Sequence, residues 1–500
     1  MIWLNFLHFY QPVNQQPDIL DAVVKQCYRP IFSRIKNIKK ANITLNISGS
    51  LIELLDKNGY ADVINDIRTS VEDKKIELTG SCKYHALLPL IPDSEAVRQI
   101  KENEKTLRNY FGDSLNLNGF FPPEMAYDDK LSRILSDLGY EWVLVDEIAN
   151  PEGYLDGVTK YINVSEKSDI KIFFRIRRIS NLIMSAVVRD TESFKNAIKH
   201  DLSKDGYLLT GMDGETFGHH RINFDDFLFK LLDDKEIIKM KISEYVDEYN
   251  ASLENRSVSP ITSTWASSPE DIKKGIQFIS WKDKDNIIHK YQWEMLEFCL
   301  DLVNNLPSNS PKYETIRRKM DQALASDHFF WASGKPWWAL EMIESGAYAL
   351  LDIVRDIPGI SDDNLKKASQ YYEKIVSISF EWQRTGKIRK MAKEQNQILR
   401  LPFKERTLER GGEEEAVYNA FIDTMKEQEL ISSKKGDYER AILWRDAIYK
   451  LENKLDIYDT INVIDLLRIE ISNERMEEII KKYKEEYLRI RGGQPEQRGS

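Results

Sequence analysis

Over the first 270 residues, short apolar runs alternate with longer segments whose apolar residues recur at three- and four-residue spacing. The short runs predict strands, and the spaced segments, such as 18–38 and 94–112, predict helices. This alternation indicates successive strand–helix units and a mostly parallel sheet. We predict a barrel of seven or eight strands, drawn from residues 2–9, 43–50, 75–80, 118–121, 142–147, 171–176, 206–212 and 259–264.

Beyond residue 270 the strand-like runs stop and helical spacing continues through 290–306, 311–325, 364–399 and 439–456. The last residues, 491–500, hold almost nothing to bury and predict a disordered tail. The chain is therefore expected to contain a catalytic barrel at 1–270, a helical region at 271–400, a helical extension at 401–490 and the tail.

Composition narrows the choice of partner. Apolar residues make up 42% and charged residues 30% of the 500, which is typical of a folded protein. The 71 basic and 81 acidic residues give a net charge of −10, so the charge balance argues against nucleic acid and fits a neutral partner such as a sugar.

Three widely spread cysteines, Cys27, Cys82 and Cys299, favour neither a disulfide framework nor a zinc site. The first residues lack a basic segment and a cleavage site, and no apolar run reaches the ~18 residues of a membrane span. We therefore expect a cytoplasmic protein that needs neither membrane nor metal. The sequence leaves the oligomeric state open.

Four polar stretches follow predicted strands, at the end of a barrel where catalytic groups gather. They are "HFYQP" (8–12), "ELTGSCKYHALLPL" (77–90), "FPPEMAY" (121–127) and "MDGETFGHHR" (212–221). Two fixed carboxylates facing each other suit cleavage of a glycosidic bond. Glu124, placed after two prolines, supplies one, and either Asp213 or Glu215 supplies the other, because both lie on one side of a continuing strand.

These stretches, together with "SDHFFWASGKPWW" (326–338), resemble in order the five motif regions of glycoside hydrolase family 57. The resemblance implies an incomplete, seven-stranded (β/α)7 TIM-like barrel, followed by a C-terminal helical domain that completes the active site. It also implies action on α-glucans with retention of anomeric configuration, without a cofactor. Family members include α-amylases, 4-α-glucanotransferases and branching enzymes.

By similarity, Glu124 is the nucleophile and Asp213 the general acid/base. Because neighbouring carboxyl groups push each other's pKa values apart, we expect a protonated Asp213 and an ionised Glu124. The resemblance further implies contacts with the sugar, or support of the nucleophile, from His8, Gln11, Glu77, His85, Glu215, His220 and Trp331. Trp331 is the aromatic assigned to the cleft, since aromatic faces suit the apolar faces of sugar rings.

The sequence leaves several functions open. We expect cleavage of α-1,4-glucosidic bonds of an oligo- or polysaccharide by an α-amylase or 4-α-glucanotransferase type of enzyme, with a 1,4-α-glucan branching enzyme as the alternative. A metal-dependent deacetylase or α-mannosidase-like enzyme would use His8, Asp213 and His219 or His220 as ligands. A glycan-binding protein without catalysis would have lost a carboxylate, but both are present.

Overall fold

The computed structural model describes residues 1–113, 115–152, 158–186, 188–202, 206–250, 252–335, 337–391 and 414–453, with residues 467, 471, 475, 478, 479 and 482. The chain divides into two compact units. The first consists of Met1–His219 and Asp225–Ala392, and the second of His220–Phe224 and Lys393–Ser500. The expected boundary at residue 400 and the expected tail at 491–500 lie outside the described residues.

The first sheet of unit 1 has the order β3-β2-β1-β8, and β9 also pairs with β1. Every pairing in it is parallel. In register, His8 of β1 lies opposite both Asn46 of β2 and Asp213 of β8. The strands are β1 (Ile2–Phe9), β2 (Ile43–Ile47), β3 (Ile76–Leu78), β8 (Tyr207–Asp213) and β9 (Lys239–Met240).

The second sheet has the order β10-β6-β7-β5-β4 and is parallel except for the antiparallel pair β6–β7. Two contacts join the second sheet to the first. A parallel bridge links Gly80 to Phe120, and the Ile176 N–H donates to the Leu209 carbonyl at 2.8 Å. The two sheets therefore touch on both sides. The strands are β4 (Gly119–Phe120), β5 (Trp142–Asp146), β6 (Ile162–Ser165), β7 (Lys171–Arg175) and β10 (Asn255–Val258).

One apolar core takes side chains from both sheets. Leu4 and Phe6 of β1 meet Trp142 of β5, Phe173 of β7 and Leu209 of β8 in this cluster. Alternate residues of a strand point to one face, so His8, two positions after Phe6, continues this inward row at the carboxyl end of β1. Burial of these large side chains is the main force that fixes the strands beneath the polar residues.

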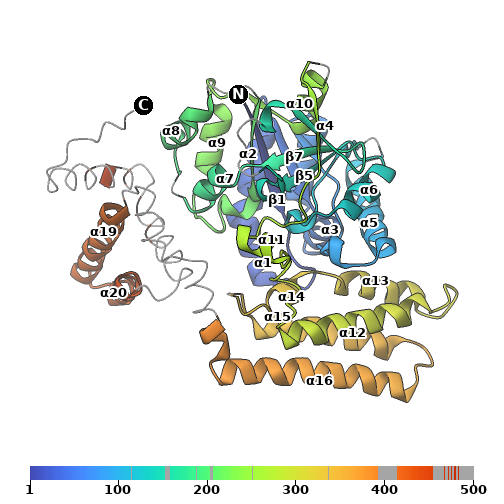
Figure 1. The fold of residues 1–500 in the computed structure, drawn as a ribbon. Coiled ribbons are helices and arrows are strands. Elements are labelled where there is room, and N and C mark those ends of the chain that lie inside the picture. Colours follow the sequence, from blue (N-terminus) through green and yellow to red (C-terminus); the bar gives the residue numbers. More distant parts are fainter. Residues whose placement is uncertain are drawn as a thin grey trace. The chain divides into compact units, whose positions relative to one another are not determined.

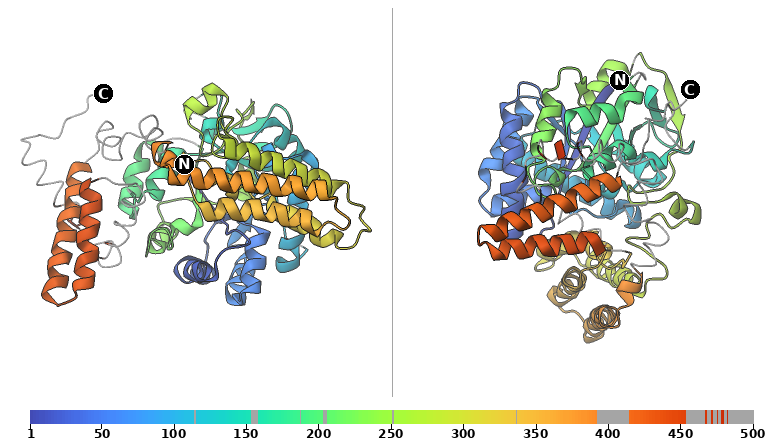
Figure 2. Two further views of the ribbon diagram at one scale, coloured as in Figure 1. Left: turned by 90° about the horizontal axis from the view of Figure 1, so that it is seen from below. Right: turned by 90° about the vertical axis from the view of Figure 1, so that its left-hand side faces the viewer.

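Helices surround the strands, and the helices between residues 287 and 384 pack on one side of unit 1 (Figures 1 and 2). Among these, α12, α15 and α16 pack against one another. Their bounds are α12 (Ile287–Asn304), α13 (Tyr313–Ala323), α14 (Asp327–Phe330), α15 (Leu340–Asp356) and α16 (Asp362–Arg384). The earlier helices are α1 (Pro17–Val23), α2 (Arg29–Asn37), α3 (Gly49–Lys57), α4 (Ala61–Glu72), α5 (Asp93–Phe111), α6 (Asp129–Asp137), α7 (Arg177–Met184), α8 (Thr191–Leu202), α9 (Asp225–Asp233), α10 (Ile242–Tyr249) and α11 (Pro269–Lys274).

Unit 2 contains the helices α19 (Glu414–Lys434) and α20 (Tyr438–Asn453), which pack together. Phe421 and Met425 of α19 and Trp444 and Leu451 of α20 belong to its own apolar cluster. This cluster agrees with the helical spacing predicted for 439–456. Within the described ranges, no helix combines the length and the apolar content needed to cross a bilayer.

The strand predictions were right for seven of the eight segments and wrong for 259–264. The structure instead ends β10 at Val258, and Pro260 follows, which has no N–H for a ladder. Strand β6, antiparallel to β7, was not predicted. The segment 259–264 contributes a single antiparallel bridge from Ser263 to Tyr127.

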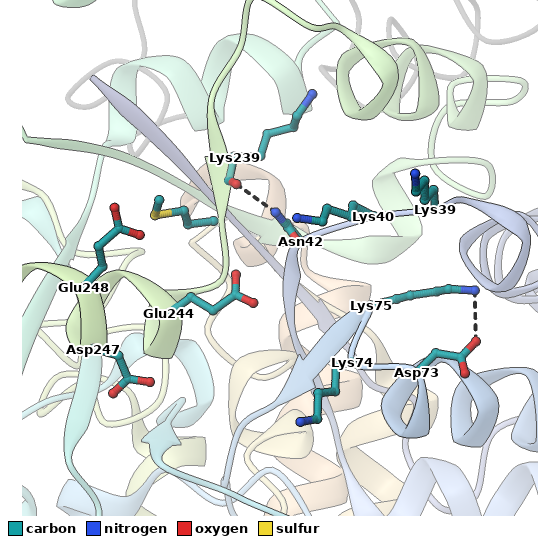
Figure 3. Close-up of a pocket in the computed structure, with 11 residues that line it drawn as sticks. Lys39, Lys40, Asn42, Asp73, Lys74, Lys75, Lys239, Glu244, Asp247 and Glu248 are labelled. Carbon is teal, nitrogen blue, oxygen red and sulfur yellow. Dashed lines mark hydrogen bonds and ion pairs between the residues drawn. The ribbon is translucent and has the colours of Figure 1, made fainter.

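A pocket of about 740 Å³ lies at the amino ends of β2 and β3, opposite the strand ends that carry the polar stretches (Figure 3). Lysines 39, 40, 74, 75 and 239 line it together with the acids Asp73, Glu244, Asp247 and Glu248. Lys75 pairs with Asp73 at 3.0 Å, and Asn42 donates to the Lys239 carbonyl at 2.9 Å. The pocket contains none of the predicted site residues.

Candidate active site

The polar residues at the carboxyl ends of the strands form one cluster in unit 1. His8 and Asp213 lie side by side in register, and β8 ends at Asp213. Glu124 follows β4 in a short 3-10 turn, and its carboxyl group interacts with the charge of Asp213. The two carboxyl groups predicted to face each other are therefore neighbours.

Glu124 has an unusual backbone. Its φ is +60° and that of Met125 is +48°, in the left-handed region that non-glycine residues rarely occupy. Pro122 and Pro123 fix their own φ and restrict the residue before them, so they do not account for this conformation. Glu124 is therefore held by contacts from elsewhere in the chain.

Trp265 supplies those contacts. Its backbone N–H donates to the Glu124 carbonyl at 3.0 Å, and its indole Nε1–H donates to Glu124 Oε2 at 2.6 Å. The side chain of Glu124 keeps 20% of its surface exposed, so it is accessible from outside. Trp265 thus fixes the carboxylate without covering it.

The pKa values of Glu124 and Asp213 are both raised above their usual range. Burial and the neighbouring Asp213 raise the pKa of Glu124 to about 8, although the Trp265 hydrogen bond opposes the rise. Burial raises the pKa of Asp213 to only about 6, because the Arg175 guanidinium favours its ionised form. Neighbouring carboxyl groups titrate as a pair, so the expected order, with Asp213 protonated and Glu124 ionised, stays a prediction.

Glu215 is buried while Asp213 is partly exposed, so the two acids of "MDGE" have different surroundings. Glu215 Oε1 accepts a 2.5 Å hydrogen bond from the Tyr28 hydroxyl, and Gln11 also bonds to Glu215. Burial and the charge of Asp213 raise the pKa of Glu215 to about 8. Any Cβ at Gly214 would lie 2.1 Å from the Phe9 ring, so only glycine fits between the two acids.

His8 and His85 belong to one hydrogen-bonded chain. His8 Nδ1 lies 2.8 Å from Asn46 Oδ1, His8 Nε2 lies 3.2 Å from His85 Nε2, and His85 Nδ1 lies 3.2 Å from Ser326 Oγ. Burial lowers the pKa of His8 to about 4 and that of His85 well below its usual value, so both rings are neutral. With Asn46 accepting, His8 Nδ1–H donates, His85 Nε2–H donates to His8, and the Ser326 hydroxyl donates to His85. His85 Nε2 is also 4.0 Å from Glu124 Oε1.

Asp327 brings the helical region into the cluster. Its Oδ2 accepts a 2.7 Å hydrogen bond from the Tyr10 hydroxyl, and the Tyr10 ring stacks on His85 with centroids 4.2 Å apart. Burial raises the pKa of Asp327 to about 6, and its charge acts on Glu124. An antiparallel bridge from Ala86 to Ala325 fixes α14 beside the loop that carries His85.

Glu77 lies nearer the amino ends of the strands than His8 does. In register, Glu77 lies opposite Thr44 of β2, whereas His8 lies opposite Asn46, two residues further along the same strand. Its Oε1 accepts bonds from the Thr44 hydroxyl at 2.5 Å and from the backbone N–H groups of Ile242 and Ser243 at 2.7 and 3.2 Å. The carboxylate therefore stabilises the amino end of α10, where its charge is favourable, and its predicted contact with the sugar or support of the nucleophile stays a prediction.

Trp331 follows α14, and its N–H donates to the Asp327 carbonyl at 2.9 Å. Its ring is partly exposed and contacts Phe330 and Trp337 edge-on. Trp331 therefore lies close to Asp327 in the chain, and its place in a sugar subsite stays a prediction. His220 belongs to unit 2 and likewise stays a prediction.

Sequence reasoning missed Trp265 and Asp327. Asp327 lies inside the fifth motif stretch, 326–338, in which sequence reasoning selected an aromatic residue, Trp331, and not this acid. Trp265 follows the polar run "SPITST" that was predicted to be a strand. A tryptophan in a loop of serines and threonines was the available signal, because a large ring there needs a packing or binding partner.

Comparison with known proteins identifies the family of this chain. The family model of glycosyl hydrolase family 57 matches residues 7–260, which is slightly more than half of the 500. The chain belongs to glycosyl hydrolase family 57. The match to this family includes Glu124, Asp213 and the strands that carry them, and it agrees with the resemblance found in the sequence.

Curated relatives include the α-amylase of Pyrococcus horikoshii, 22% identical over 312 residues, covering 58% of this chain and 48% of the relative. α-Amylase 1 of Dictyoglomus thermophilum is 25% identical over 218 residues, covering 42% of this chain and 31% of the relative. The chain thus spans half or less of the length of these relatives.

Solved structures share the fold. The 4-α-glucanotransferase of Thermococcus litoralis has a TM-score of 0.55 at 16% identity, covering 71% of this chain and 58% of that one. A family 57 branching enzyme from Thermococcus kodakaraensis has a TM-score of 0.58 at 14% identity, covering 74% of this chain and 94% of that one. Among the residues described here, no group of three or more His, Cys, Asp or Glu side chains is arranged to hold a metal ion.

Proposed function

We propose that this protein is a retaining α-glucan-active enzyme that cleaves α-1,4-glucosidic bonds through a covalent glycosyl-enzyme, with an α-amylase or 4-α-glucanotransferase outcome. One observation carries the proposal: Glu124 and Asp213 are partly exposed, electrostatically coupled carboxyl groups at the carboxyl ends of β4 and β8 in a family 57 chain. Two such groups are what displacement at an anomeric carbon requires.

The architecture that supports this function is an incomplete barrel. We infer that the seven strands β1, β2, β3, β4, β5, β7 and β8 enclose the core, since all of them are linked by parallel pairings, the Gly80–Phe120 bridge and the Ile176–Leu209 hydrogen bond. Their carboxyl ends carry the candidate residues, as in other barrel enzymes.

In the proposed mechanism, Glu124 attacks the anomeric carbon while Asp213 protonates the leaving oxygen, and Asp213 then activates water or a sugar hydroxyl. Asp213 is favoured over Glu215 because Glu215 is buried and bonded to Tyr28. His8, His85, Gln11 and Asp327 border the pair and are proposed to contact the sugar or support the two acids.

The first displacement inverts the anomeric carbon and the second inverts it again, so the product should appear as the α-anomer. Proton NMR of a fresh maltooligosaccharide digest, read before mutarotation, measures this directly. The α signal should grow ahead of the β signal. An initial β-product would mean that Glu124 activates water, and it would exclude the covalent intermediate.

Activity should depend on pH as a bell centred near pH 7. Cleavage needs one ionised and one protonated carboxyl group in the pair, whose pKa values are raised to about 6 and about 8. Below about 6 both are protonated and no nucleophile remains; above about 8 both are ionised and no acid remains. Values of kcat/KM from pH 5 to 9 at constant ionic strength check this, and a flat profile would contradict the assignment of the pair.

A branching enzyme shares this chemistry, since it differs in the hydroxyl that accepts the glycosyl group. Amylose should therefore be incubated with the protein and assayed in parallel for reducing ends, iodine colour and branch points. New reducing ends indicate hydrolysis, a change in chain-length distribution without them indicates transfer, and branch points indicate the alternative.

A further inference from the structure

The 263–267 loop pairs with the segment that contains Glu124. Ser263 and Tyr127 exchange two backbone hydrogen bonds, at 2.9 and 3.2 Å, and Trp265 adds its bonds to the carbonyl and carboxylate of Glu124. Positive φ at Glu124 and Met125 costs about 1 to 3 kcal/mol each, and such a conformation persists only where its surroundings over-determine it. The position of the loop therefore sets the position of the carboxylate.

Arg177, the first residue of α7, binds this loop through three backbone carbonyls. Its Nη1 donates to the Ser267 carbonyl at 2.8 Å, and its Nη2 donates to the carbonyls of Trp265 and Thr264 at 2.8 and 3.3 Å. The planar fork of a guanidinium can reach several acceptors in fixed directions at once, which an ammonium cannot do. Arg177 therefore fixes the orientation of the loop as well as its position.

Asp146 at the end of β5 holds Arg177 in turn. Its carboxylate is fully buried and accepts from Arg177 Nε and, at 2.7 Å, from Arg175 Nη1. Arg175 also donates to the Gly211 carbonyl of β8 at 2.6 Å and lies 5.7 Å from the centre of the Trp265 ring. A buried carboxylate with two guanidinium partners stays paired if one of them is replaced, so this anchor tolerates a change at Arg177.

We propose that Arg177, anchored by Asp146, is a positioning residue that acts through the 263–267 loop to hold the Trp265 indole N–H against the Glu124 carboxylate. The inference rests on the proposed function, in which Glu124 is the nucleophile. The indole N–H stabilises the ionised carboxylate, and the backbone pairing aims it. The side-chain hydrogen bonds of Arg177 go to Asp146 and to the carbonyls of the 263–267 loop and not to Glu124, so its effect must pass through Trp265.

Two variants test the pathway. Trp265→Phe removes the donor and keeps a ring, and Arg177→Lys keeps the charge but loses the fork. Each should lower kcat about 10²-fold with little change in KM, and each should move one limb of the kcat/KM profile up by about one pH unit, because Glu124 without its donor ionises at higher pH. The double variant should lose less than the product of the two effects.

The control is Arg178→Lys on the same helix, since Arg178 donates to the Ala197 carbonyl away from the loop. It should leave kcat and both pH limbs unchanged. If Arg177→Lys lowers activity but leaves both limbs in place, or if its effect multiplies with that of Trp265→Phe, Arg177 has only a structural role and the proposal is overturned.

A readout without turnover separates this inference from the proposed function. The indole ¹H–¹⁵N signal of Trp265, assigned by its loss in Trp265→Phe, should shift with pH in the wild type and not in Glu124→Gln. Arg177→Lys should weaken that shift. If the shift behaves so in a protein inactive on α-glucans, the positioning stands and the proposed function fails; an unchanged shift in Arg177→Lys overturns the positioning even in an active enzyme.

Discussion

Replacing Glu124 with glutamine should lower kcat on amylose by at least about 10³-fold while leaving the fold intact. Glutamine keeps an oxygen that can accept the Trp265 indole bond, so the strained turn retains its contacts, but it cannot attack the anomeric carbon. Steady-state kinetics and the thermal unfolding midpoint together measure the two parts of this expectation. Glu141→Gln, an exposed glutamate beside β5, is the matched control and should be fully active.

The role of Glu124 can be read from a chemical rescue. In Glu124→Ala, azide should replace the missing nucleophile on an α-maltosyl fluoride and give the β-azide, with one inversion. The same assay on Asp213→Ala should give the α-azide, because azide then intercepts the glycosyl-enzyme formed by Glu124. Products of the opposite configurations would exchange the two roles.

The second large effect is expected from Asp213→Asn. Loss of the general acid should lower kcat on natural glucans by at least about 10³-fold, but should reduce the glycosylation rate with a fluoride leaving group much less, because fluoride departs without a full proton transfer. Single-turnover rates on maltooligosaccharides and on α-maltosyl fluoride provide the comparison. Equal losses on both substrates would mean that Asp213 does not protonate the leaving group.

Glu215→Gln serves as the comparison for Asp213→Asn, since Glu215 is buried and bonded to Tyr28. Its loss should be milder and independent of the leaving group. A leaving-group dependence in Glu215→Gln, with a mild Asp213→Asn, would transfer the acid role to Glu215.

The sequence predicted the features of this protein that depend on local pattern. Apolar runs located seven strands, and the polar residues after them located Glu124 and Asp213. Local pattern failed where the deciding contact spans the chain. Trp265 lies 141 positions from Glu124, and Asp327 lies 317 positions from Tyr10, so neither pairing leaves a periodic trace.

The errors have the same origin. Residues 259–264 have the composition of a strand, yet the segment pairs with a turn and not with a sheet edge. The hydrogen bonds of Glu77 to the amino end of α10 likewise span the chain and leave no local trace. The raised pKa of Asp213 depends on burial and on the opposing charge of Arg175, which are properties of the folded site alone.

The pairing of Ala86 with Ala325, and of Tyr10 with Asp327, also bears on how such an enzyme can change in evolution. A strand-end loop and a helical segment more than 200 residues later must keep matching surfaces. Recombination that exchanged the strand-bearing half for that of a distant relative would separate matched partners and leave Tyr10 and His85 without their acceptor and donor. We expect the two halves to be inherited together, so new substrate preferences should arise by substitution within both halves and not by shuffling them.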